Sequence, residues 1–205
     1  MTAAMTERWF ENPAIGQRAR IMTLPGQTDG YSFVLEYIHQ PFTGKLAVPA
    51  HLHPAASETF EILSGQARYQ LGAEERTAIA GETIMMPAGK THVHPWSDSD
   101  EALHVRQTAR VERADLRGLT ASLQAAITIF GMAEAGRVNR HGAPPLLQLA
   151  VLLNETIPAT YLARPAIPVQ RIAFALLGRL GRALGYRLAY PEYGILTSAG
   201  VVREG

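Results

Sequence analysis

The chain has 205 residues, which is long enough for one sizeable core or for one domain with an appendage. Its net charge of +1 gives no global field that would favour nucleic acid or an acidic substrate. It has no cysteine, which excludes disulfides and thiolate metal ligands.

The first ten residues lack the apolar run of a signal peptide, because Glu7 and Arg8 stand there. In the C-terminal part, the longest uncharged stretch, 118–133, falls short of the about 20 apolar residues that a spanning helix needs. We therefore expect a cytoplasmic protein with no membrane partner and no nucleic-acid partner.

Short apolar runs separated by Gly and Pro turn signals occupy residues 18 to 110. We expect strands at 18–24, 31–39, 48–53, 59–63, 66–71, 76–79, 83–86, 91–96 and 102–108. The pair Gly72-Ala73 separates two of them as a hairpin turn would. Strands at this regular spacing indicate an antiparallel sandwich or barrel.

The pattern changes at about residue 113. Apolar residues then recur at helical spacing, which predicts three helices, at 116–130, 146–162 and 169–188. The net charge also changes sign, from −3 over 1–113 (10 basic, 13 acidic residues) to +4 over 114–205 (9 basic, 5 acidic). We therefore expect a β-barrel domain at 1–113 and a helical extension at 114–205.

The extension is unusually apolar for a free-standing appendage. The stretch 146–153 is apolar on almost every side and must be buried, so we expect the helices to pack on the barrel or across a dimer interface. Pro158 is expected to kink or split the second helix.

In the third helix, four residues face one way: Ile172, Leu176, Leu180 and Leu184. A different stripe carries Arg171, Arg179 and Arg182. We interpret these arginines as a solvated face or as partners in interface ion pairs, rather than as a stripe for anionic lipid or nucleic acid.

Four side chains that commonly bind metals lie in two stretches flanked by turns: His51, His53, Glu58 and His92. Residues two apart on a strand share a face, so His51 and His53 point the same way, and Glu58 can return to that face on the next strand. Three imidazoles and a carboxylate are a complete ligand set for one divalent transition metal. The sequence leaves Fe, Mn, Ni, Cu, Co and Zn open.

The two stretches resemble the two motifs of the cupin family. The first is Gly44-x6-His51-x-His53-x4-Glu58-x6-Gly65, and the second is Gly81-x5-Pro87-x-Gly89-x2-His92. The resemblance implies a mainly β fold, a small double-stranded β-helix or jelly-roll barrel, whose metal is held by those three histidines and Glu58. The chain departs from the family pattern in two places: six residues instead of five separate Gly44 from His51, and Trp96 stands where the second motif usually ends in Asn.

Other side chains are candidates for the wall of a ligand pocket. His94 shares the face of His92, two residues on, and is expected either to contact substrate or to pack as a structural histidine. Four further candidates, each with core packing as the alternative, are Trp96, Met85, Phe60 and Tyr37.

The resemblance implies a class of chemistry and not a substrate. One hypothesis is a metal-dependent dioxygenase-type oxidoreductase, or less readily an isomerase, that acts on a small organic molecule with Glu58 as a catalytic group. A second is a non-enzymatic module that binds or senses a small ligand, with the helices forming a homodimer. A third is a dimerisation scaffold in which the metal only stabilises the fold.

Overall fold

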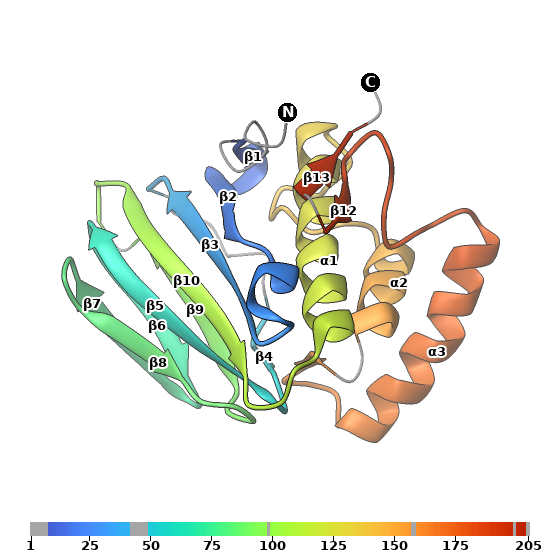
Figure 1. Cartoon of the computed structure of the whole chain (residues 1–205), viewed down its shortest axis with the longest axis horizontal. Coiled ribbons are helices and arrows are strands. Elements are labelled where there is room, and N and C mark those ends of the chain that lie inside the picture. Colours follow the sequence, from blue (N-terminus) through green and yellow to red (C-terminus); the bar gives the residue numbers. More distant parts are fainter. Residues whose placement is uncertain (1–7, 42–48, 98, 157–158, 199, 204–205) are drawn as a thin grey trace.

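Two antiparallel sheets in the first half of the chain form a double-stranded β-helix, the jelly-roll barrel expected from the sequence (Figure 1). This computed structural model describes residues 8–41, 49–97, 99–156, 159–198 and 200–203. The larger sheet has the order β1 (Phe10–Asn12), β2 (Gln17–Thr23), β3 (Ser32–His39), β10 (Leu103–Val111), β5 (Ala56–Ser64) and β8 (Thr83–Met86). The smaller sheet has the order β11 (Tyr161–Leu162), β4 (His51–Leu52), β9 (His92–Ser97), β6 (Gln66–Leu71) and β7 (Glu74–Ile79).

Each expected strand corresponds to one of these elements. The expected strand at 48–53 is represented by β4, while its first residue and Gly44 of the first motif lie outside the described residues. Gly72 has a φ of +65° in the turn between β6 and β7, a conformation that favours glycine. Strand β1 was not expected, because three residues are too few to show an alternating pattern.

One face of the larger sheet is buried by two different partners. At one end it faces the smaller sheet around a core that includes Phe60, Met86 and Val105. At the other end its inward side chains pack against helix α1 (Leu116–Glu134), where Leu119 and Leu123 lie in a second core. The helix buries this side because its apolar residues recur every three or four positions.

The C-terminal part contains α1, α2 (Leu146–Thr156), α3 (Ile167–Ala183) and a hairpin of β12 (Ile195–Thr197) with β13 (Gly200–Val202). The expected second helix is wrong at its end: α2 stops at Thr156, and the residues expected to finish it form β11 instead, paired with β4. Pro158 lies outside the described residues. The third helix starts earlier than expected and ends five residues earlier, before Gly185 at a φ of +92°. The division of the chain at residue 113 stays a prediction.

Helices α2 and α3 pack closely on each other because α3 presents glycines to its neighbour. A Cβ atom on Gly181 would lie 2.7 Å from Val151 Cγ2 and 2.9 Å from the Leu147 carbonyl oxygen, so only glycine fits. The buried side of α3 therefore runs through Gln170, Phe174, Gly178 and Gly181. Among the described residues, no helix combines the length and the hydropathy needed to cross a bilayer.

Candidate metal centre

Five side chains meet at the junction of the two cores. Their ligand atoms all lie within 4.8 Å of one another: His51, His53, Glu58, His92 and His94. Strand pairing explains the meeting, because His51 on β4 lies directly opposite His92 on β9, and Glu58 projects from β5 on the other sheet. The cluster therefore joins the two halves of the barrel.

Three of the histidines are oriented by backbone carbonyl groups. The Nδ1 atoms of His51, His53 and His92 lie 3.0, 3.0 and 2.9 Å from the carbonyl oxygens of Pro49, Ala159 and Lys90 respectively. A carbonyl oxygen only accepts, so each Nδ1 must donate, and the remaining lone pair of each neutral ring is on Nε2. This is the arrangement in which a histidine binds a metal through Nε2 and is held through Nδ1.

Glu58 supplies the carboxylate of the cluster. Its Oε1 accepts a hydrogen bond from Gln107 Nε2 at 2.7 Å, and its Oε2 lies 2.9 Å from His92 Nε2 and 3.5 Å from His53 Nε2. Neutral Nε2 atoms and a carboxylate oxygen are all acceptors, so these approaches are repulsive unless a cation lies between them.

The Nε2 atoms of His53 and His92 are also buried, and neither has a hydrogen-bond partner among the described residues. Unpaired buried acceptors are costly, and a metal ion would satisfy them. The donor set therefore fits a divalent transition metal, whose identity the geometry leaves open.

The electrostatic environment favours the protonation states that metal binding requires. Burial, reinforced by the neighbouring histidines, lowers the pKa of His51 well below its usual 6.5, and burial also lowers that of His53. Burial works to raise the pKa of Glu58, but the neighbouring histidines, His94 first among them, bring it well below 4.5. Near neutral pH the cluster thus presents neutral rings at His51 and His53 and an ionised carboxylate, as metal ligands must be.

Acid should destabilise the metal-free protein. Because the pKa of His51 is lower in the folded state, the unfolded chain takes up protons first as the pH falls below about 6.5, and stability is lost from there downward. The lowered pKa of Glu58 has the same sign and acts at lower pH. Urea unfolding between about pH 8 and pH 5 should show this decline. A stability that rises toward pH 5 would contradict it.

The cluster contains five of the residues expected in the site. His51, His53, Glu58 and His92 are brought together, and His94 joins them with its Nε2 3.0 Å from Glu58 Oε2.

The other expected pocket residues are arranged around the site or outside it. Phe60 is fully buried with its ring centroid 5.0 Å from that of His94, while Tyr37 donates from its buried hydroxyl to the Pro95 carbonyl oxygen at 3.1 Å. Trp96 is half-buried, opposite Arg68 on β6.

Met85 was expected in the pocket, and the structure places it elsewhere. Its side chain is 56% exposed and accepts a weak hydrogen bond from Thr59 Oγ1. Successive residues on a strand face opposite ways, and on β8 it is Met86 that points into the core, with no exposed surface.

Two contributions to the site were not expected from the sequence. Gln107 is the one polar residue among the five inward positions of β10, and this break in an apolar alternation was a usable signal. The carbonyl of Ala159 and the hydroxyl of Thr160, 3.0 and 3.1 Å from His53 Nδ1, come from the segment that follows α2. No sequence pattern indicates them, because they lie more than 100 residues from His53.

A pocket opens beside the cluster, between the barrel and α1. Its polar lining comes from His53 and Glu58 of the cluster and from Asp115 and Ser122 at the start of α1. The rest of the lining is apolar: Phe33, Ala55, Ala56, Ala109, Val111, Leu119 and Ala159. The enclosed volume is about 50 Å³, well below the roughly 300–1,000 Å³ of a drug-sized ligand site, so only part of a ligand would be enclosed.

Residues 43–106 match the family model described as the Cupin domain. This chain contains a cupin domain. The matched segment includes every member of the cluster, so the histidines and Glu58 belong to the cupin domain itself. The chain matches none of the curated proteins with which it was compared.

Solved structures with similar folds include proteins of different kinds. A predicted oxalate decarboxylase from Thermotoga maritima is 15% identical over 54% of this chain and 96% of that one, with a TM-score of 0.45. KdgF from Halomonas sp. is 14% identical over 54% and 91%, with a TM-score of 0.42. A sugar phosphate isomerase from Silicibacter pomeroyi is 18% identical over 48% and 62%, with a TM-score of 0.39.

This cupin chain spans less than two thirds of that isomerase, and 61% of a further similar structure, from Acidithiobacillus ferrooxidans. At these identities the likeness concerns the fold alone.

Proposed function

We propose that this protein is a metal-dependent enzyme, a dioxygenase-type oxidoreductase that acts on a small organic molecule. His51, His53, Glu58 and His92 would hold the metal. The observation that carries the proposal is the pocket, because two members of the cluster, His53 and Glu58, form part of its wall. A structural metal site is usually closed by protein ligands, whereas a catalytic one faces a space for substrate.

A bound divalent metal would supply Lewis-acid or redox chemistry at this wall. The protein itself positions the metal ligands and shields the site from water. Gln107 fixes one oxygen of Glu58, so the other oxygen faces the histidines. His94, bonded to that second oxygen and with a quarter of its side chain exposed, can exchange a proton between Glu58 Oε2 and solvent.

The pocket also indicates the substrate class. Seven of its eleven lining residues are apolar, and five of those seven are alanine or valine, which leaves room for a flat or compact apolar body. Asp115 and Ser122 provide polar contacts at the α1 side. A small phenol, flavonol or thiol matches this lining better than a sugar, which would need polar partners on most sides.

The proposal is tested by metal analysis of protein purified without a chelating column, followed by oxygen-uptake assays with phenols, flavonols and thiols. We expect a redox-active metal and oxygen uptake with at least one class. Protein that carries only zinc and consumes no oxygen with any of them would refute the oxidoreductase. Ligand binding without oxygen uptake would instead support the sensing module. The homodimer and the cytoplasmic location stay predictions.

Filling the pocket should separate substrate binding from metal binding. Ser122→Phe places a ring in the pocket from α1, while the metal ligands are untouched. We expect unchanged metal content and at least a tenfold loss in kcat/KM, which corresponds to about 1.4 kcal/mol. Arg117→Phe, an equally large ring at an exposed position of the same helix, is the control and should leave both unchanged.

A further inference from the structure

The outward face of α3 is apolar along its length. Five aliphatic residues on this face, four in α3 and Leu184 directly after it, are each at least half exposed, from 50% at Leu180 to 66% at Ile172: Val169, Ile172, Leu176, Leu180 and Leu184. They recur every three or four residues, so they form one continuous stripe, which we call the α3 stripe. The helix packs on α2 through a different side, the one with Phe174, Gly178 and Gly181, so the stripe is no part of the core.

The charge around the α3 stripe is mainly positive. Five arginines and no acidic residue lie between Glu155 and Glu192: Arg164, Arg171, Arg179, Arg182 and Arg187. Arg182 forms an ion pair with Glu155 at 2.7 Å, whereas Arg171 and Arg179 form none with the residues that the structure describes. At 100° per residue, Arg179 falls on the flank of the stripe next to Ile172, whereas Arg171 and Arg182 lie farther round the helix, toward the side of Gly178. An anionic partner is therefore the one that complements this face.

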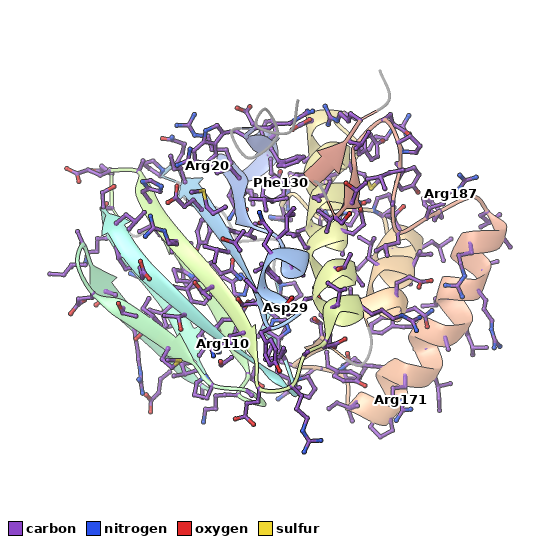
Figure 2. All side chains as sticks on the ribbon, in the orientation of Figure 1. Arg20, Asp29, Arg110, Phe130, Arg171 and Arg187 are labelled. Atoms are coloured by element: carbon purple, nitrogen blue, oxygen red, sulfur yellow. The ribbon has the colours of Figure 1, made fainter. Side chains whose placement is uncertain are left out.

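The position of α3 makes the stripe reachable by a flat surface. The helix forms the outer edge of the molecule, on the side away from the sheets, with Arg171 near its start and Arg187 beyond its end (Figures 1 and 2). Its 17 residues give a length of about 25 Å. A convex helix edge suits a plane, while a protein partner would need a matching groove.

We propose that α3 docks this protein on an anionic phospholipid surface. The α3 stripe would enter the boundary between headgroups and acyl chains, and Arg179 on its flank would contact lipid phosphates. A second copy of the chain fits less well, because a two-fold pairing of this face would bring arginines against arginines. The sequence-based expectation of no membrane partner rested on the lack of a spanning segment, and a helix that lies on the surface needs none.

Vesicle co-sedimentation tests this inference independently of any catalytic function. The full chain is mixed with vesicles of phosphatidylcholine alone, and with vesicles of three parts phosphatidylcholine to one part phosphatidylglycerol. We expect binding to the anionic vesicles only, weakened by added salt. Arg179→Gln should reduce the binding by about fivefold, and Leu176→Glu with Leu180→Glu should abolish it.

The variants change exposed residues, so their circular dichroism and metal content should match the wild type. Ile79→Glu, the same kind of change at an equally exposed position on β7, is the matched control and should bind like the wild type. Failure of the wild type to bind anionic vesicles overturns the inference. The inference is also overturned if the wild type is a dimer in sedimentation velocity and Leu176→Glu converts it to a monomer, since the α3 stripe would then pair two copies of the chain.

Discussion

Replacing His92 with alanine is expected to abolish tight metal binding. The His92 side chain is almost completely buried, its Nδ1 is held by the Lys90 carbonyl oxygen, and its Nε2 lies 2.9 Å from Glu58 Oε2. Its loss removes one of four proposed ligands, and the affinity should fall by more than the about 10- to 100-fold typical of losing an outer partner of a ligand. Elemental analysis should give about one metal per wild-type chain and nearly none for His92→Ala.

The loss of metal binding should also lower the free energy of unfolding measured in the presence of metal. Metal at a hundred times its Kd stabilises a folded protein by about 2.7 kcal/mol, and this increment should be absent from the variant. His104→Ala is the matched control, because His104 lies outside the cluster, 3.6 Å from Glu36 Oε2. It should keep its metal. Stoichiometric metal in His92→Ala would show that His92 is no ligand.

A related variant distinguishes a functional metal from a structural one. His53 directly follows β4 and lies at the pocket wall, so its removal should disturb the core less than removal of His92. If His53→Ala loses metal but melts with the metal-free wild type, the fold does not depend on the ion. Collapse of the fold would indicate a structural metal, because binding would then be linked to folding.

The barrel and the clustering of His51, His53, Glu58 and His92 were predictable because both rest on short-range patterns. Strands are indicated by alternating apolar and polar residues and by the Gly and Pro that end them. His51 and His53 are two residues apart, which places them on one face of a strand. Gly65 shows why such punctuation is specific: it has a φ of +83°, and a Cβ there would lie 2.6 Å from the Ala102 carbonyl oxygen.

What the sequence could not predict depends on partners far along the chain. Residues 161–162 are apolar and continue the pattern of α2, but the open edge of β4 offers them backbone hydrogen bonds, and they form β11. Local periodicity carries no information about that edge. The Ala159 carbonyl beside His53 follows from the same docking.

Helix α3 shows a different limit of sequence-based prediction. Periodicity correctly indicates that Ile172, Leu176 and Leu180 share a face, but not whether anything covers it. The packing face was instead decided by Gly178 and Gly181, which let α2 approach to backbone contact. A glycine adds nothing to a hydrophobic pattern, so the pattern does not indicate the side of the helix that packs on α2.

Replacing Gln170 with leucine is expected to weaken both the fold and the metal site. Gln170 is fully buried; its Nε2 donates to the carbonyl oxygens of Leu162 and Pro165 at 2.7 and 2.6 Å, and its Oε1 accepts from the Leu162 amide at 2.9 Å. Leucine leaves these partly buried backbone groups without this partner, and water can replace it only in part. Urea unfolding of the metal-free protein should therefore show a loss of about 1–3 kcal/mol.

The second effect follows from where Leu162 lies. It pairs with His51 through β11 and β4, and the same segment brings the Ala159 carbonyl to His53. Gln170→Leu should thus loosen two proposed ligands and reduce metal affinity by about 10- to 100-fold, as the loss of an outer partner does. Metal titration of the folded variant measures this.

Gln148→Leu provides the comparison. Gln148 is also a fully buried glutamine on a helix, but its partners are the Arg187 carbonyl and the Tyr190 hydroxyl, which lie away from β11. It should lose stability but keep its metal affinity. If both variants bind metal equally well, the helical segment supports the fold without positioning the site. A drop confined to Gln170→Leu means that the residues after α2 position metal ligands that lie about a hundred residues earlier in the chain.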